Sequence, residues 1–335
     1  MRAQVVHRHG GPEEMVFEPA FPDPAPAPGE VRLRVRAASL NYHDVFTRNG
    51  MPGITVPLPI VMGLDMAGEI ESLGSGVAGW RVGERVLVDP TDWEDGTLMG
   101  ETRNGGLAEL CCVGAGQLIR LPEDVSFAAA AALPVAYGTA HRMMLTNGKV
   151  SAGEKVLILG ASGGVGTCCV LLAKLAGAEV IAATSSAAKA ERLKAMGADR
   201  IIDYSREDFV RVVREAYGKP TRLRPTGGVD VVVNFTGGET WVPSLKALRL
   251  GGRLLTCGAT AGYDPKTDIR YIWTFELDIK GSNGWRRDDL ERLVELVRRR
   301  KLVPEIDRVL PLEAAAEGLR LIEAREVMGK VVIEP

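Results

Sequence analysis

The sequence predicts an α/β protein in which a doubly wound parallel sheet accompanies a smaller β-barrel or sandwich. The chain has 335 residues, more than one ordinary core holds, so two domains are expected. Strand-like periodicity fills the first third, and strands alternate with helices from about residue 125. A glycine-rich segment at 160–166 lies between one of these strands and the next helix.

The first third of the chain has the pattern of an all-β domain. Residues 31–37 alternate strictly between apolar and charged side chains, which is typical of a strand with one solvated face. Further strands are expected at 67–73, 85–88 and 107–113, separated by glycine-rich turns. Together they predict the barrel or sandwich.

The middle of the chain alternates between buried strands and helices, which predicts a parallel doubly wound sheet. A helix is expected to start at 128–133. The expected strands that follow are 155–159, 179–183, 200–203, 229–233 and 253–257. The expected helices between them are 164–175, 187–196, 207–217 and 241–248. Beyond residue 270 the pattern weakens, to strands at 277–280 and 330–333 and helices at 288–300 and 313–324.

Composition narrows the classes of function. The net charge of −2 gives no electrostatic case for nucleic acid or an anionic membrane. The N-terminus lacks the apolar region of a secretory signal, and the longest apolar stretch, 127–140, is too short to span a bilayer. We therefore expect a cytoplasmic protein. The five cysteines show no C-x-x-C spacing, so reduced core thiols are expected rather than disulfides or a zinc knuckle.

The glycine-rich segment resembles a phosphate-binding loop, although it departs from a strict G-x-G-x-x-G. It reads Gly160-Ala161-Ser162-Gly163-Gly164-Val165-Gly166. It follows an expected strand and opens an expected helix, which is the context that a dinucleotide fingerprint requires. The helix N-terminus offers free N–H groups to a pyrophosphate. We expect contacts from Ser162, Gly163, Gly164 and Val165; the alternative is a purely structural glycine turn.

The second strand of the middle region predicts NADPH as the cofactor. NAD sites usually place an acidic residue at the end of this strand, where it binds the ribose 2′-OH. Here the strand runs into Thr184, Ser185 and Ser186, with Lys189 beyond. Hydroxyls and a cation suit a 2′-phosphate. The alternative is that Ser186 only caps a helix and Lys189 is a solvated charge. Tyr204, after the third strand, is expected to cover the adenine ribose.

Four segments of the chain carry a family resemblance. They are SLNYHDVFTRNG at 39–50, GLDMAG at 63–68, VAGWRVGERV at 77–86 and ALPVAYGTA at 132–140. The chain resembles, over essentially its whole length, the medium-chain dehydrogenase/reductase family in its quinone oxidoreductase-like branch. The resemblance implies a GroES-like β-barrel catalytic domain (1–124 and 270–335) and a Rossmann NADPH-binding domain (125–269). It also implies an active site in the cleft and a homodimer or homotetramer assembled through the cofactor domains.

The resemblance allows a test for zinc. Zinc members of the family place a cysteine where Asn41 stands, a His-Glu pair where Leu64 and Asp65 stand, and a third ligand near Leu133. Leucine cannot bind a metal, and asparagine is a poor zinc ligand beside thiolate or imidazole. The stretch 89–105, where a structural zinc lobe would fall, holds no cysteine. The sequence therefore predicts a zinc-independent enzyme.

Without a Lewis acid, the expected chemistry is hydride delivery from NADPH to an acceptor that is already electrophilic. The resemblance implies that Asn41 lies beside the nicotinamide and Thr139 near its carboxamide. Asn41 could also donate to a substrate carbonyl or enolate, or serve only as a polar turn residue. Tyr42, His43 and Asp44 are candidate proton donors, with solvent as the alternative.

Residues after the fourth and fifth strands complete the expected cofactor site. They are Asn234, Gly258, Ala259 and Thr260. The favoured function is an NADPH:quinone oxidoreductase that acts on a planar or conjugated carbonyl compound. The alternatives are an NADPH-dependent enoyl or enone reductase (2-alkenal or enoyl thioester) and a non-enzymatic NADPH-binding structural protein. Some thioester reductases of the family have a tyrosine where Met51 stands, a departure that weakens the thioester alternative.

Overall fold

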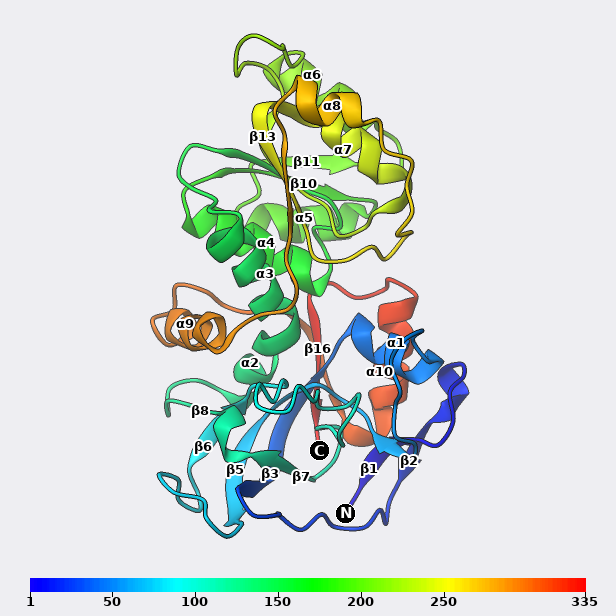
Figure 1. Ribbon diagram of the computed structural model, residues 1–335, viewed down its shortest axis with the longest axis vertical. Coiled ribbons are helices and arrows are strands. Elements are labelled where there is room, and N and C mark those ends of the chain that lie inside the picture. The colour runs from blue at the N-terminus through cyan, green and yellow to red at the C-terminus, as the bar shows by residue number, and fades with distance from the viewer. The chain divides into compact units, whose positions relative to one another are not determined.

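The chain folds into two compact units, as the computed structural model of residues 1–335 shows (Figure 1). Unit 1 consists of Met1–Ala136 and Arg287–Pro335, and unit 2 of Tyr137–Arg286. The fold class expected from the sequence is confirmed, since unit 1 is built on antiparallel β-structure and unit 2 on a parallel sheet with helices between its strands.

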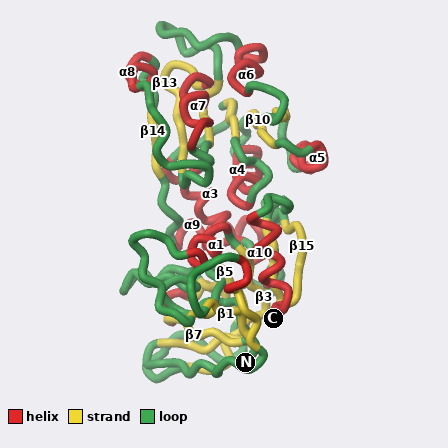
Figure 2. The backbone as a smooth tube through the Cα atoms, turned by 90° about the vertical axis from the view of Figure 1, so that its right-hand side faces the viewer, coloured by secondary structure: helices red, strands yellow, loops and turns green.

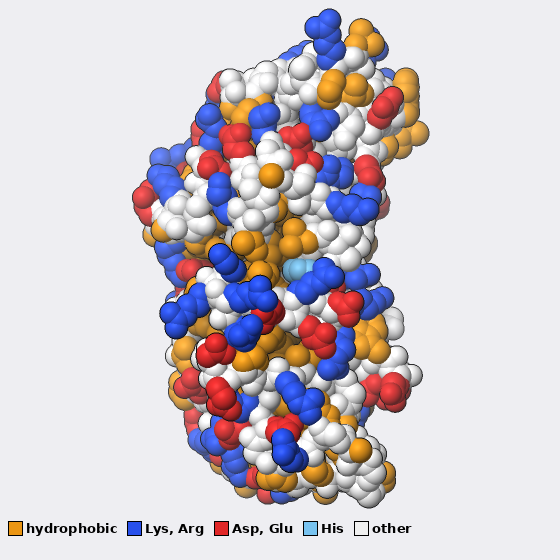
Figure 3. Space-filling model, turned by 90° about the vertical axis from the view of Figure 1, so that its left-hand side faces the viewer, with side chains coloured by type: hydrophobic (Ala, Val, Ile, Leu, Met, Phe, Trp, Pro, Cys, Tyr) orange, Lys and Arg blue, Asp and Glu red, His pale blue; other side chains and the backbone are white.

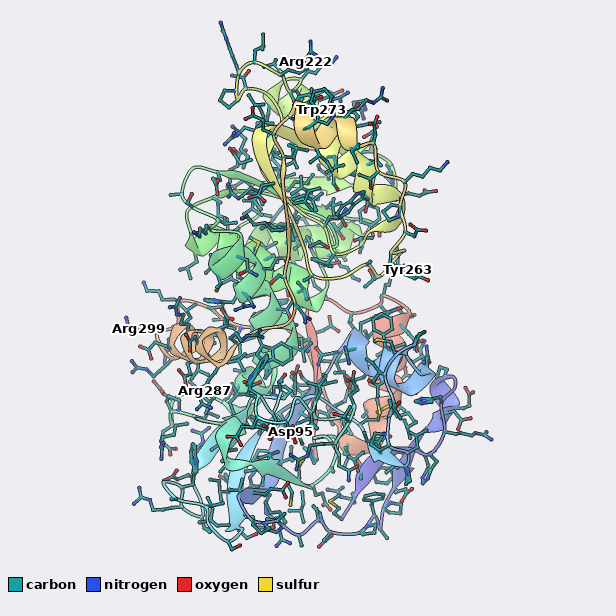
Figure 4. The ribbon with its side chains drawn as sticks, viewed as in Figure 1. Asp95, Arg222, Tyr263, Trp273, Arg287 and Arg299 are labelled. Atoms are coloured by element: carbon teal, nitrogen blue, oxygen red, sulfur yellow. The ribbon has the colours of Figure 1, made fainter.

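The boundaries between the two units lie after residues 136 and 286, later in the chain than the expected boundaries after residues 124 and 269. Helix α2 (Phe127–Ala131) packs against strands of unit 1 and therefore belongs to it. Strand β14 (Asp278–Gly281) is hydrogen-bonded into the sheet of unit 2. Helix α9 (Arg287–Arg298) returns to unit 1, where Arg287 donates to the carbonyls of Gly116 and Leu118, both at 2.7 Å. Figure 4 labels Arg287 on this helix.

Unit 1 is organised around the long strand β3 (Glu30–Leu40). Its apolar residues point inward at every second position, as the alternation in the sequence predicts. The main sheet has the order β15-β16-β3-β5-β6-β8, and β7 also pairs with β3. The other strands are β5 (Asp65–Leu73), β6 (Arg85–Val88), β7 (Leu110–Gly114), β8 (Leu118–Arg120), β15 (Ile306–Pro311) and β16 (Lys330–Glu334). A small second sheet contains β1 (Ala3–Val6), β2 (Met15–Glu18) and β4 (Ile60–Val61).

Two helices of unit 1 lie side by side although they are far apart in the sequence (Figures 1 and 2). Helix α1 (Tyr42–Asn49) follows directly on β3, and α10 (Ala315–Glu323) precedes β16. The buried guanidinium of Arg48 donates to both carboxylate oxygens of Glu323, at 3.1 and 3.0 Å. This two-pronged pair holds the last turn of α1, which belongs to the segment 39–50 that carries the family motif, against the C-terminal part of the chain.

Unit 2 is a six-stranded parallel sheet with the order β11-β10-β9-β12-β13-β14, which confirms the doubly wound prediction. Its strands are β9 (Lys155–Ile158), β10 (Glu179–Thr184), β11 (Arg200–Asp203), β12 (Val229–Val233), β13 (Leu248–Thr256) and β14. Its helices are α4 (Gly164–Leu175), α5 (Ala187–Ala195), α6 (Phe209–Tyr217), α7 (Trp241–Ala247) and α8 (Ile269–Thr274). The strand order reverses beside β9, so the switch point, where such sheets bind ligands, lies at the loop after β9.

A long helical run leads from unit 1 into unit 2. The sequence predicts only its start at 128–133, but the structure continues through a π-helical turn (Leu133–Gly138), α3 (Thr139–His141) and a second π-helical turn (Arg142–Asn147). Pro134 interrupts the ordinary helical hydrogen bonds because it has no N–H group. In the widened turn, the N–H of Val135 donates instead to Oδ1 of Asp65, at 2.9 Å.

The surface mixes both signs of charge. Lys and Arg side chains are interspersed with Asp and Glu on the face shown in Figure 3, in keeping with the net charge of −2. No helix of the chain combines the length and the apolar character that crossing a bilayer requires. All five cysteines are free; three are buried as expected, but Cys112 and Cys257 are only half-buried.

Candidate active site

The loop after β9 has the geometry of a phosphate cradle. Gly160 has a φ of 66°, in the left-handed region that favours glycine. Gly163 caps α4 but has no side chain to accept hydrogen bonds from the first turn, and that turn holds no acidic residue. The N–H groups at the start of α4 are therefore available to an anion. The predicted contact residues Ser162, Gly163, Gly164 and Val165 all remain accessible at this turn.

Gly166 explains why this loop requires glycine at the end of its motif. A Cβ atom at Gly166 would lie 2.2 Å from the carbonyl oxygen of Gly160, closer than any real contact. The absence of a side chain at Gly166 therefore lets the helix pack directly against the loop backbone. The third glycine of a dinucleotide fingerprint has the same role. The purely structural alternative accounts for this packing but not for the uncapped helix start.

The carboxyl end of β10 brings together the residues predicted to select NADPH. Thr184 ends the strand and is buried, whereas Ser185 is exposed. Ser186 does cap α5, since its Oγ accepts from the N–H of Lys189 at 3.4 Å. The N–H of Tyr204 donates to the carbonyl of Thr184 at 3.3 Å. Tyr204, expected to cover the adenine ribose, therefore lies beside the residues expected to bind the 2′-phosphate. No carboxylate stands between Thr184 and Lys189.

Asn234, predicted to contact the cofactor, has another task in the structure. Its buried amide nitrogen donates to the hydroxyls of Thr240 and Ser244, at 3.0 and 2.9 Å. Its Oδ1 accepts from the N–H groups of Thr236 and Gly237, both at 2.9 Å. Because these bonds use the hydrogen-bonding capacity of the side chain, Asn234 shapes the loop after β12 and has no donor left for a cofactor.

The remaining predicted residues of unit 2 lie near the phosphate loop. Gly258, Ala259 and Thr260 are exposed after β13, and the N–H of Thr260 donates to the carbonyl of Phe235 at 3.3 Å. The ring of Phe235 in turn packs against Gly160. Figure 4 shows Tyr263, 92% exposed, extending outward from the same loop. Thr139 begins α3, which packs against α4.

In unit 1, three neighbouring strands bring a polar cluster together at one end of the main sheet. Asn41 follows β3, Asp65 begins β5 and Lys330 begins β16. In the sheet β3 lies between β16 and β5, so these three residues become neighbours despite their distance in the sequence. We call Ser39, Asn41, Asp65 and Lys330 the polar cluster.

The polar cluster is buried and densely hydrogen-bonded. Oδ2 of Asp65 accepts from Oγ of Ser39 (2.9 Å), Nδ2 of Asn41 (2.8 Å) and Nζ of Lys330 (3.1 Å). Lys330 also donates to the carbonyl of Leu40 (2.9 Å) and to Oδ1 of Asn41 (2.5 Å). Asp65 and Lys330 are 0% and 2% exposed, so the pair is a buried salt bridge. The sequence analysis identified Asn41 as a site residue, named Asp65 only as a position where zinc members carry one of a His-Glu pair, and missed Lys330.

Asp44, one of the candidate proton donors, caps the first turn of α1. Its Oδ2 accepts from the N–H of Asn41 at 2.7 Å. Burial raises the pKa of this carboxyl to about 6, although the hydrogen bond from Asn41 opposes the change. Its side chain is fully buried, so it is the least accessible of the three candidates.

His43 has an acidic partner that the sequence motifs did not reveal. Its Nε2 lies 2.5 Å from Oε2 of Glu101, which is 7% exposed. Burial lowers the pKa of His43, but the hydrogen bond and the charge of Glu101 outweigh it, and the pKa is raised overall. Glu101 lies in a loop without a recognisable motif, so only the fold brings it to His43. Tyr42 is exposed and packs its ring edge-on against Phe46.

The polar cluster does not have the chemistry of a zinc site. Leu64 and Leu133 are buried apolar side chains without a ligating atom. Asn41 and Asp65 turn their oxygens to the ammonium of Lys330, which is itself a cation. Residues 1–335 contain no group of three or more His, Cys, Asp or Glu side chains arranged to hold a metal.

Comparisons with known proteins agree with this two-part architecture. The family model described as the alcohol dehydrogenase GroES-like domain matches residues 27–123, and the model described as zinc-binding dehydrogenase matches residues 164–299. The rat synaptic vesicle membrane protein VAT-1 homolog is 31% identical over 100% of this chain and 84% of its own length.

Two bacterial reductases and two solved structures are also similar. Crotonyl-CoA reductase of Streptomyces avermitilis is 31% identical, covering 99% of this chain and 84% of its own. The 2-haloacrylate reductase of a Burkholderia species is 32% identical, covering 99% and 98%. A structure described as an NAD-dependent alcohol dehydrogenase has a TM-score of 0.92 at 36% identity and covers 100% of both chains. The 2-octenoyl-CoA carboxylase reductase CinF, in complex with NADP and 2-octenoyl-CoA, has a TM-score of 0.85 at 28% identity, covering 96% and 82%.

Proposed function

Because this chain belongs to the medium-chain dehydrogenase/reductase family, in its quinone oxidoreductase-like branch, we propose that it reduces the conjugated double bond of an enoyl thioester or enone. The observation that carries the proposal is the amide of Asn41, in which Lys330 and Asp65 engage Oδ1 and one N–H and leave the second N–H with only a long contact, 3.5 Å, to the carbonyl of Ser39. Such a donor suits a carbonyl oxygen that gains negative charge during reduction. Full-length similarity to reductases of crotonyl-CoA and 2-haloacrylate supports this acceptor class over the quinone favoured by the sequence.

The reductant is NADPH. The end of β10 offers hydroxyls at Thr184 and Ser185 and a cation at Lys189, and no carboxylate that would repel a 2′-phosphate. The similar CinF structure holds NADP, whereas another similar structure is described as NAD-dependent. The residues of this chain at β10 decide between the two, and they favour NADPH.

We assign the steps of the reaction to residues of unit 1. NADPH, when bound, supplies the hydride that reaches the carbon β to the carbonyl. The N–H of Asn41 stabilises the resulting enolate oxygen. His43, held by Glu101, donates the proton that completes the reduction. The N–H of Asn41 takes the place of a Lewis acid at the oxygen, so we propose that the reaction is zinc-independent.

The acceptor class is tested by following NADPH oxidation with crotonyl-CoA, but-3-en-2-one and 9,10-phenanthrenequinone. We expect kcat/KM for the better conjugated carbonyl to exceed that for the quinone by at least about tenfold, the usual discrimination of a fitted pocket. NADH in place of NADPH is expected to be at least about tenfold poorer, because a 2′-phosphate site is left empty. Reduction of the quinone alone would contradict this proposal and support an NADPH:quinone oxidoreductase instead. Tight NADPH binding without turnover of any acceptor would favour the non-enzymatic protein.

The proton donor is tested by the pH dependence of kcat. If the imidazolium of His43 donates the proton, activity falls as pH rises through its pKa. Glu101 raises that pKa, so Glu101→Gln is expected to move the alkaline fall of kcat to lower pH. Glu109→Gln, which changes a carboxylate paired with Arg2, is the matched control and should leave the profile unchanged. Identical profiles for wild type, Glu101→Gln and His43→Gln would show that solvent supplies the proton.

We also propose that the enzyme is a cytoplasmic homodimer joined through unit 2. Strand β14 is an edge strand, and Ile279 on it is partly exposed. Trp273 on the adjacent α8 is 69% exposed and is labelled in Figure 4. An exposed strand edge with apolar side chains beside it is suited to pair with a second copy. The five free cysteines agree with a reducing compartment.

A further inference from the structure

Lys330 carries a buried ammonium group that no step of the proposed reaction uses. Its side chain is 2% exposed, at the start of the apolar strand β16. Three oxygens surround Nζ: the carbonyl of Leu40, Oδ1 of Asn41 and Oδ2 of Asp65. An ammonium group has three N–H donors, so this site satisfies it completely. Lys330 therefore cannot reach a substrate and must act through its neighbours.

The charges of Lys330 and Asp65 leave the amide of Asn41 only one favourable orientation. The ammonium can only donate, so Oδ1 of Asn41 must face it. The carboxylate can only accept, so Nδ2 must face Asp65. A flipped amide would set its NH₂ group against the ammonium and its oxygen against the carboxylate. Both contacts would be repulsive, and water could not screen them in this buried site.

This orientation decides what Asn41 can offer to a ligand. Oδ1 is covered by the ammonium of Lys330, and one N–H of Nδ2 is bound to Asp65 at 2.8 Å. The second N–H has only the carbonyl of Ser39 within reach, at the long distance of 3.5 Å. The group of Asn41 left with only a long, weak partner is therefore a donor, the second N–H. The ammonium beside Oδ1 also draws electron density from the amide and makes that N–H a stronger donor.

We propose that Lys330 is a positioning residue: together with Asp65 it fixes Asn41 with an N–H toward the substrate carbonyl oxygen, and its ammonium fills the place that a metal ion would need. The inference rests on the proposed function, because it takes Asn41 to meet that oxygen. Although the family model over residues 164–299 is described as zinc-binding, the oxygens of this cluster already hold a cation. A divalent ion there would be repelled by the ammonium.

The test removes both charges together. Lys330→Met alone would leave the buried carboxylate of Asp65 unpaired, which is strongly destabilising. The double variant Lys330→Met/Asp65→Asn keeps the side-chain shapes and leaves no charge unpaired, so we expect its Tm to stay within about 5 °C of wild type. In this variant the amide of Asn41 is free to flip. We therefore expect kcat for crotonyl-CoA to fall about 10- to 100-fold, while KM for NADPH changes by less than about twofold.

The outcomes separate the inference from the proposed function. Wild-type kcat in the double variant would overturn the positioning role and leave the proposed reduction standing. Failure of the wild-type enzyme to reduce any conjugated carbonyl would instead remove the proposed function, and the inference with it. If the double variant unfolds below the assay temperature, both it and the wild type are assayed at a lower temperature where circular dichroism shows the variant folded, with the same two outcomes. Metal analysis of the purified wild-type enzyme should give far less than one zinc per chain; stoichiometric zinc would overturn the second part of the inference.

Discussion

Asn41→Ala is expected to lower kcat for crotonyl-CoA by about 100- to 1,000-fold, the usual effect of removing one donor to a developing oxyanion. The variant removes the N–H that the polar cluster holds in place and leaves the salt bridge between Lys330 and Asp65 intact. KM for NADPH should change little, since the phosphate loop and the end of β10 are untouched. Steady-state kinetics with NADPH and crotonyl-CoA measure both constants.

Ser39→Ala is the matched control for this prediction. Ser39 donates to the same oxygen of Asp65, at 2.9 Å, and to the carbonyl of Ala131, at 2.8 Å, but it has no part in the proposed chemistry. Its loss should disturb the cluster with less than about a tenfold change in kcat, because an ordinary hydrogen bond contributes only modestly. Equal losses in the two variants would mean that the cluster serves stability alone and that Asn41 has no direct role.

Gly166→Ala is expected to raise the Kd for NADPH by about 100-fold or more, because a displacement of about 1 Å in a positioned site has effects of that size. The new Cβ would lie 2.2 Å from the carbonyl oxygen of Gly160, so either the loop or α4 must move. Either movement shifts the N–H groups that we expect to cradle the pyrophosphate. Titration of NADPH by its fluorescence measures the affinity directly.

Gly116→Ala is the control for the glycine substitution. A Cβ at Gly116 would meet no atom within 4 Å, and the residue belongs to unit 1. NADPH affinity should therefore equal that of wild type. If Gly166→Ala also bound NADPH normally while remaining folded, the loop would be a structural turn and the cofactor site would have to be sought elsewhere.

The parallel sheet of unit 2 could be predicted closely because its signals are local. Short apolar runs bounded by glycine and polar turns give the strands, and α4, β11 and β12 have the predicted bounds. In unit 1, β6 has the predicted bounds, but other strands escaped prediction. Strands such as β4 and β15 are formed by pairing with distant partners and have little pattern of their own. Helix α1 was also missed, since its sequence was interpreted only as a motif.

The candidate site was predicted wherever its residues share a motif and missed where the fold alone joins them. Asn41 and His43 lie in one segment, so sequence alone could identify them. Lys330 is 289 positions from Asn41, and only the pairing of β16 with β3 brings the two together. One signal was available: a lysine opens a strand that is otherwise apolar and buried. Glu101 gave no such signal, because it lies in a loop.

The pairing of β16 with β3 also affects how the protein is made. Unit 2 is encoded by one continuous stretch, 137–286, so it can complete its core while the ribosome is still adding residues. Unit 1 has to wait. Until residues 330–334 have been synthesised, residues 38–40 of β3 lack their pairing with β16, and the carboxylate of Asp65 lacks its counter-charge. The main sheet therefore keeps one unpaired strand edge until late in translation, and a chaperone or a neighbouring chain could bind it.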